Sequence, residues 1–229
     1  MFSNSPSNSS AQRSRPRTGV RAAALTVPLT IVGVLAAAVP PAQAAPAQTQ
    51  ASATRHNGPS QCRGEGVDTS ARIRYQSDAV IKAPLSTVFK LQTDVERWPD
   101  WQPPVLTMKR LDPGPLHRGS QFRWTTPAPA TPTTPATTLE ITSAVQQLQR
   151  NHCILWRGPA IGEGLRIDEG VHLWTFTKVK GGVRVHTEET WTGAQVEADI
   201  PTATAALGTG LEAWLHDLKT TAESRTRAQ

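Results

Sequence analysis

The chain has 229 residues, of which 24 are Lys or Arg and 18 are Asp or Glu, so its formal net charge is +6 at pH 7. Four arginines, Arg13, Arg15, Arg17 and Arg21, lie near the N-terminus, and the remainder holds 20 basic and 18 acidic residues, a net charge of +2. This small excess, without a run of Lys and Arg, argues against nucleic-acid binding. The remainder is long enough for one domain with a substantial core.

Residues 1–44 have the order of a secretory signal peptide. An apolar run from Ala22 to Val39 follows the basic stretch, and Ala42-Gln43-Ala44 then offers a small-x-small cleavage site. Pro28 and Gly33 interrupt the run, which is short for a membrane span. We therefore predict a secreted, extracellular protein with no stable membrane anchor after cleavage.

Residues 45–71 are rich in Ala, Gln, Ser and Gly without apolar periodicity, so they are expected to form a flexible tail. The chain has two cysteines, Cys62 in this tail and Cys153 in a predicted strand. Export predicts a disulfide between them, and two free thiols or an intermolecular bridge are the alternatives. No Cys/His spacing indicates zinc, and neither a metal nor a cofactor is expected.

From residue 72 onward, apolar and polar residues alternate as they do in antiparallel strands with one buried face. A short helix is predicted from Pro84 to Asp94, followed by a stretch broken by prolines. The turn Lys180-Gly181-Gly182 predicts a hairpin between the last two strands. The predicted strands are 73–83, 105–111, 120–125, 137–147, 152–158, 171–179 and 183–193.

Two segments are predicted to be loops. Residues 125–138 consist of Thr, Pro and Ala, and proline lacks the donor that a central strand needs, so an extended surface loop is expected. Residues 158–170 contain four glycines and are expected to form a mobile loop at the mouth of a cavity.

The last segment changes its period. Apolar residues recur at three- and four-residue steps and predict an amphipathic helix from about Thr202 to Ser224, followed by a disordered end at 225–229. One face of the predicted sheet is apolar, and this helix is the element long enough to cover it. The sequence therefore predicts an α+β fold with one domain over residues 72–224.

On these segments the chain resembles the START-like superfamily, also called SRPBCC or helix-grip, and in particular its polyketide cyclase/dehydrase-like members. The resemblance rests on residues 81–105, where Asp94 to Pro103 follows a "D-x-x-x-y-p-x-W-x-P" pattern, and on ILWRG, GVHLWTF and WLHDLKTTAE. Many relatives carry an "H-x-E-x-F-x-G" strand, which appears here as Thr187-x-Glu189-x-Trp191-x-Gly193. The resemblance implies a curved antiparallel sheet of about seven strands wrapped around the long C-terminal helix. One or two short helices would follow the first strand, and a cavity for an apolar molecule would lie inside.

Glu189 is a carboxylate on the apolar face of its strand, because Val183, Val185, Thr187 and Trp191 share that face. A turn at Lys180-Gly181 places His172 directly opposite Glu189, and a turn at Gly181-Gly182 places it diagonally. Either register predicts a polar His–Glu pair on the inner face. His186 and Glu188 fall on the outer face and are expected to be solvated.

Aromatic residues dominate the predicted inner face, and they indicate either a pocket for planar ligands or a filled core. The predicted cavity residues are Tyr75, Trp98, Trp101, Phe122, Trp124, Trp156, His172, Trp174, Phe176, Glu189, Trp191, Leu211, Trp214 and Leu215. The expected function is binding of a lipid, aromatic or polyketide-like small molecule by a monomer. The alternatives are a cyclase or dehydratase using His172 and Glu189 as acid and base, and an interaction module with a filled core.

Overall fold

The computed structural model describes residues 60–132 and 134–227. The signal peptide predicted for residues 1–44, and residues 45–59 of the predicted tail, lie outside the described residues. None of the helices in the described part of the chain is both long enough and apolar enough to cross a membrane.

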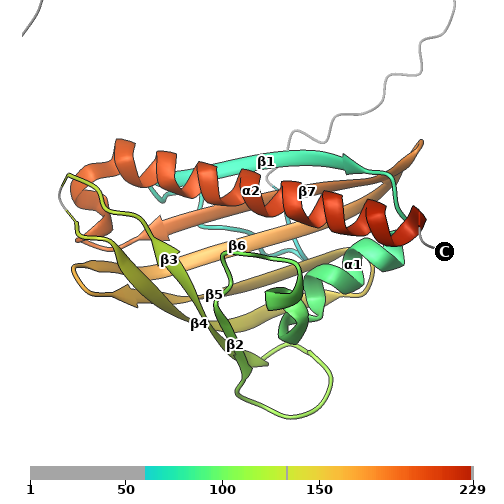
Figure 1. The fold of residues 1–229 in the computed structure, drawn as a ribbon, viewed down its shortest axis with the longest axis horizontal. Helices are drawn as coiled ribbons and strands as arrows, with labels where there is room; N and C mark the ends of the chain where they lie inside the picture. The colour runs from blue at the N-terminus through green and yellow to red at the C-terminus, as the bar shows by residue number, and fades with distance from the viewer. Residues whose placement is uncertain (1–59, 133, 228–229) are drawn as a thin grey trace, which may run out of the picture. The chain divides into compact units, whose positions relative to one another are not determined.

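The fold is one seven-stranded antiparallel sheet gripping a long helix, which confirms the predicted helix-grip architecture (Figure 1). The order across the sheet is β1-β7-β6-β5-β4-β3-β2, so the strands from β2 to β7 form a meander and β1 pairs with the last strand. The strands are β1 (Ile73–Ile81), β2 (Thr107–Arg110), β3 (Gln121–Ala128), β4 (Thr137–Gln149), β5 (Cys153–Gly162), β6 (Leu165–Val179) and β7 (Gly182–Thr192). The helices are α1 (Leu85–Thr93), the 3₁₀ helices η1 (Val95–Asp100) and η2 (Val196–Asp199), and α2 (Ile200–Arg227).

The β6–β7 hairpin fixes the register of the sheet around Glu189. Val179 pairs with Gly182, so Lys180-Gly181 forms the turn and His172 lies directly opposite Glu189. Gly181 has φ of 87°, a left-handed conformation that glycine adopts without a steric penalty. Of the two registers that the sequence left open, the structure has the first.

Helix α2 runs along the inner face of the sheet, and its two halves pack differently. Figure 1 shows α1 beside the C-terminal half of α2. There, Trp214, Leu215 and Leu218 join a core cluster with residues of α1, η1 and the sheet. The N-terminal half contributes Ala203, Leu207 and Leu211 to a second, smaller cluster.

The outer face of the sheet is partly covered by residues 60–71, which are ordered rather than part of a flexible tail. Cys62 and Cys153 are joined by a disulfide, with their Cα atoms 5.5 Å apart. Cys62 and Val67 pack on outer-face residues that include Leu155 and Leu173. A disulfide that spans 91 residues of sequence thus attaches this segment to β5.

Glu188 was expected to be solvated, but its side chain is only 1% exposed and pairs with Arg74. Nε2 of His186 lies 3.9 Å from Oε2 of Glu188, and the His186 side chain is 13% exposed. The prediction failed because strand alternation assigns a residue to a face but cannot show what covers that face.

The predicted 125–138 loop is shorter in the structure, because β3 continues to Ala128 and β4 begins at Thr137. Pro127 is tolerated inside β3 because β2 pairs no further than Thr125. The Thr125 carbonyl accepts a bond from Leu106 on the β2 side, so the nitrogen of Pro127 points to the same side, beyond the end of β2. The missing donor therefore leaves the β3–β4 ladder intact.

Two other boundaries differ from the predictions. Residues 158–170 form no mobile loop, because β5 reaches Gly162 and β6 begins at Leu165, leaving a two-residue turn in which Gly164 has φ of 69°. At the C-terminus, α2 continues to Arg227, so residues 225–227 are helical rather than disordered.

Candidate functional site

A cavity of about 360 Å³ lies between the N-terminal half of α2 and strands β3 to β7. Its helix side carries small residues at helical spacing, Ala203, Ala206, Gly210 and Ala213. Small side chains at these positions fill little of the space. Leu207 and Leu211 of the same half of α2 line the cavity as well, so its helix wall combines small and large side chains.

The sheet side of the cavity also carries small residues. Gly158, Ala160 and Gly170 lie among the lining residues on β5 and β6. A Cβ added at Gly170 would lie 3.4 Å from Oε1 of Glu189 and 3.4 Å from Cδ1 of Trp191. A larger side chain at this position would therefore contact the carboxylate that the sequence placed on the inner face.

Four indoles line the cavity: Trp124, Trp156, Trp191 and Trp214. The rings of Trp124 and Trp214 meet edge to face, with centroids 5.6 Å apart. Trp214 is fixed further because its Nε1–H donates to Oε1 of Gln92 at 3.1 Å. These anchored rings form rigid walls, which planar apolar molecules contact well.

Seven of the fourteen predicted cavity residues line this space, and the other seven do not. Leu211, His172 and Glu189 lie at the cavity with the four indoles. Six of the others belong to the packed core cluster or to its edge. These six are Trp98, Trp101, Phe122, Trp174, Phe176 and Leu215. The aromatic residues on the inner face of the sheet thus form a packed core under the C-terminal half of α2 and a cavity wall under its N-terminal half.

Tyr75 has a different role from the predicted one. Its ring packs on Gly208, where a Cβ would lie 2.7 Å from Cε2 of the ring. Its hydroxyl donates to the carboxylate of Glu212, one turn further along α2. Tyr75 therefore connects β1 to the helix and does not line the cavity.

His172 holds a polar partner at each ring nitrogen. Nδ1 lies 3.0 Å from Oε2 of Glu189, and Nε2 lies 2.8 Å from the hydroxyl of Thr187. The second carboxylate oxygen, Oε1, accepts a bond of 2.7 Å from Nε1 of Trp191. Thr187 and Trp191, two residues of the Thr187-x-Glu189-x-Trp191-x-Gly193 segment, thus both contribute to this cluster.

The electrostatics of the pair are dominated by burial, which disfavours the charged form of each partner. Burial raises the pKa of the Glu189 carboxyl from 4.5 to about 7, although the bond from Trp191 acts to lower it. Burial lowers the pKa of the His172 imidazole from 6.5 to about 3. At pH 7 the imidazole is neutral, and the carboxyl is divided between acid and carboxylate.

Gain or loss of the Glu189 proton reverses both bonds of His172. When Glu189 is a carboxylate, Nδ1–H donates to it and Nε2 accepts from the Thr187 hydroxyl. When Glu189 is protonated, its O–H donates to Nδ1, and Nε2–H donates to Thr187. The cluster thus accommodates either protonation state without an unpaired nitrogen.

Gln102 and Ser143 are two polar lining residues that the sequence reasoning missed. Both side chains are about 1% exposed. Ser143 accepts a bond of 3.3 Å from Nε1 of Trp124. Gln102 directly follows the WPDW stretch of the family pattern, and this position next to two tryptophans was the available signal.

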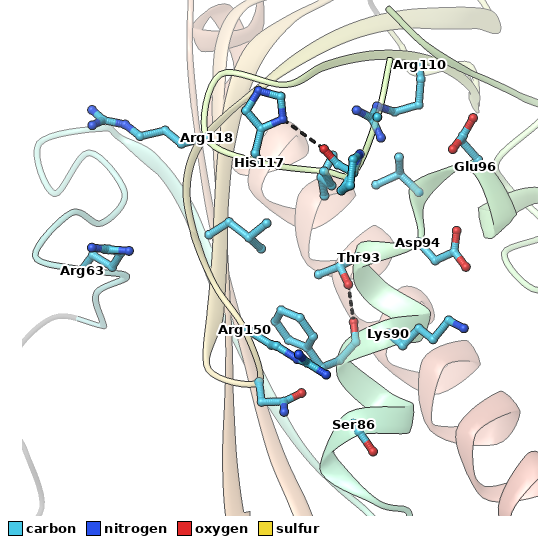
Figure 2. Close-up of a pocket in the computed structure, with 17 residues that line it drawn as sticks. Arg63, Ser86, Lys90, Thr93, Asp94, Glu96, Arg110, His117, Arg118 and Arg150 are labelled. Atoms are coloured by element: carbon cyan, nitrogen blue, oxygen red, sulfur yellow. Dashed lines mark hydrogen bonds between the residues drawn. The ribbon is translucent and has the colours of Figure 1, made fainter. Parts of the chain in front are cut away.

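A second pocket, of about 840 Å³, lies between α1, the 111–120 loop and the β4–β5 turn (Figure 2). Figure 2 shows Arg63 and Arg118 on one side of it and Asp94 and Glu96 on the other. Its walls thus carry both signs of charge. Among residues 60–132 and 134–227, no group of three or more His, Cys, Asp or Glu side chains is placed to hold a metal ion.

Solved structures with the same fold are found at low identity. Hypothetical protein jhp0584 from Helicobacter pylori is 16% identical and matches 74% of this chain and 98% of its own, with a TM-score of 0.53. A START superfamily protein from Mycobacterium smegmatis is 15% identical over 67% of this chain and 99% of its own, with a TM-score of 0.51. The di-domain ARO/CYC StfQ from the steffimycin biosynthetic pathway is 16% identical over 67% of this chain and 51% of its own, with a TM-score of 0.51. At such identities the likeness shows the fold alone.

No protein with a curated description matches the chain. The family model described as "Polyketide cyclase / dehydrase and lipid transport" matches residues 72–223, which is nearly the whole described domain. The helix-grip architecture and the inner cavity agree with that match. The chain therefore belongs to the polyketide cyclase/dehydrase and lipid transport family.

Proposed function

We propose that the protein is a monomeric binder of an apolar, ring-containing small molecule, which it holds in the cavity under the N-terminal half of α2. The observation that carries this proposal is the cavity itself, about 360 Å³ in volume and walled by four indoles and aliphatic side chains. A mostly apolar pocket with a few convergent polar groups is the usual form of a small-molecule site. The family match, whose description includes lipid transport, supports the same function.

Export is part of this proposal. The predicted signal peptide and the Cys62–Cys153 disulfide both support an oxidising compartment outside the cytoplasm. A binder in that compartment would carry or scavenge its ligand rather than receive it from an intracellular carrier.

Native mass spectrometry of the protein, purified without detergent, tests the binding. We expect an adduct of small-molecule mass on the wild type. Gly210→Leu should lose the adduct, because Gly210 lines the cavity and a Cβ there meets open space. Thr209→Leu is the matched control, since it adds the same side chain to an exposed neighbouring position outside the lining. A bare mass for the wild type, or an adduct that survives in Gly210→Leu, would overturn the proposal.

A dehydratase or cyclase is the second candidate function, and the pKa of Glu189, raised to about 7, favours it. A carboxyl that titrates near neutral pH can give a proton to a departing hydroxyl, and its carboxylate form can remove one from carbon. Incubation of the bound ligand with the wild type would then yield a product lighter by one water. Glu189→Gln should bind without this conversion; a ligand recovered unchanged from the wild type would exclude the reaction for that compound.

A further inference from the structure

Gln102, one of the residues that line the cavity, carries a buried hydrogen-bond acceptor that no described residue uses. Gln102 lies after η1, is 1% exposed and lines the cavity. Its Nε2 donates to the backbone carbonyl of Trp214 on α2 at 3.2 Å. Its Oε1 is buried and has no partner among the described residues.

The orientation of this amide is determined by its surroundings. The Trp214 carbonyl can only accept, so the NH₂ group must face it and the oxygen is left over. The backbone of Gln102 is held as well, because its N–H donates to Trp98 at 2.8 Å and its carbonyl accepts from Val105 at 2.9 Å. Oε1 is therefore a fixed acceptor.

A buried acceptor without a partner is unfavourable, and about nine-tenths or more of buried polar groups are satisfied in proteins. A ligand that places a hydroxyl against Oε1 would remove this penalty. A ligand of the same shape without a donor would leave the penalty in place. The orphan oxygen thus gives the cavity a means of selecting between otherwise similar apolar molecules.

We propose that Gln102 is a specificity-determining residue that selects hydroxyl-bearing ring compounds, alcohols or phenols, by accepting a hydrogen bond from the ligand at Oε1. This inference rests on the proposed binding function and adds the chemical class of the ligand. The planar part of the ligand lies against the indoles of Trp124 and Trp214, which line the same cavity. Its hydroxyl donates to Gln102, and Glu189 on the sheet is available to a second oxygen.

Gln92 provides the matched control. It is fully buried, its Oε1 accepts from Nε1 of Trp214 at 3.1 Å, and its Nε2 has no partner among the described residues. Unlike Gln102, it is not among the residues that line the cavity. The two glutamines share burial and a contact with Trp214, and they differ in access to the ligand.

The test compares 2-naphthol with 2-methoxynaphthalene, in which a methyl ether replaces the hydroxyl and so removes the donor. Binding is measured by calorimetric titration of the wild type, Gln102→Met and Gln92→Met. One neutral hydrogen bond is worth roughly 1 kcal/mol, so the wild type should bind the naphthol about five- to tenfold more tightly. Gln102→Met should bring this ratio close to one. Gln92→Met removes the bond that holds Trp214, so it should weaken the binding of both probes alike and keep the ratio. Gln102→Leu repeats the measurement with a different side-chain shape. The affinity ratio of the wild type is itself a test, because it does not depend on whether any variant folds.

The outcomes separate this inference from the function on which it rests. Tight binding of both probes with equal affinity, or a ratio that survives in Gln102→Met and Gln102→Leu, would overturn the role of Gln102 and leave the binding function standing. A ratio that is lost only in Glu189→Gln would assign the hydroxyl to the sheet instead, and would also overturn it. Failure of both probes to bind the wild type would overturn the inference and count against the binding function as well.

Discussion

Two glycines in α2 should respond in opposite ways to the same substitution. A Cβ at Gly208 would lie 2.7 Å from Cε2 and 2.9 Å from Cδ2 of the Tyr75 ring, whereas a Cβ at Gly210 meets nothing within 4 Å. The hydroxyl of Tyr75 donates to Glu212, one turn further along α2, so the ring is held against the helix at its tip. The ring therefore cannot turn aside without breaking that bond.

The expected magnitudes follow from two contributions. Alanine is favoured over glycine inside a helix by about 1 kcal/mol, and this gain is common to both positions. At Gly208 the overlap with the ring of Tyr75 opposes it, and overpacking of this kind typically costs about 1–3 kcal/mol. Because the helix gain cancels between the variants, Gly210→Ala should be more stable than Gly208→Ala by about 1–3 kcal/mol.

Urea denaturation followed by far-ultraviolet circular dichroism measures this difference, and an unchanged denaturant slope would show that the unfolded state is unaffected. Tyr75→Ala should remove the difference, because it deletes the ring that the new methyl group meets. Equal stabilities for the two alanine variants would refute the argument. So would a difference that persists in the Tyr75→Ala background.

Three further outcomes concern the cross-link and the buried charges. Cys153→Ser should lower the free energy of unfolding by about 2–5 kcal/mol in a urea titration, because the disulfide closes a span of 91 residues; an unchanged midpoint would contradict this. Burial acts to raise the pKa of Glu188, but His186 and Arg74 outweigh it and hold the pKa below 4.5. A carboxyl with a lowered pKa stabilises the native state above its unfolded pKa. Glu188→Gln should therefore lower the free energy of unfolding at pH 7 by about 1–3 kcal/mol, a value reduced by the 37% exposure of Arg74. The difference from the wild type should shrink as the pH falls below 4.5. Between pH 4.5 and about 7, the Glu189 carboxyl is protonated in the native state but not in the unfolded state, so the wild type loses stability as the pH rises. Glu189→Gln should therefore gain stability relative to the wild type over this range. A difference in melting temperature that does not change with pH would contradict this.

The sequence predicted the strands, the long helix and the face on which each strand residue lies, because these depend on local periodicity. Glu189 and His172 were assigned to the inner face from alternation alone, and the structure places them 3.0 Å apart. The local sequence pattern was less accurate for the ends of strands and loops. The prolines of residues 125–138 predict a loop, although Pro127 lies in β3 where the neighbouring strand has already ended.

Strand alternation could not show which aromatic residues fill the core and which line the cavity. Trp174 is fully buried in the core, whereas Trp156 and Trp191 line the cavity, and all three lie on the inner face of predicted strands. A signal did exist in the helix, since small residues at 203, 206, 210 and 213 follow one side of it.

By itself, the sequence determined the α+β class, the long helix over one apolar face of the sheet and the polar pair on that face, because side-chain period and turn chemistry act over neighbouring residues. The helix-grip arrangement was implied by the family resemblance. Only the tertiary structure decided where the interior stays open, that Tyr75 binds the helix rather than the cavity, and that Gln102 keeps an acceptor free. Those features arise where segments distant in the chain meet. Their packing depends on the volumes and hydrogen-bond partners on both sides of the contact, which no single segment contains.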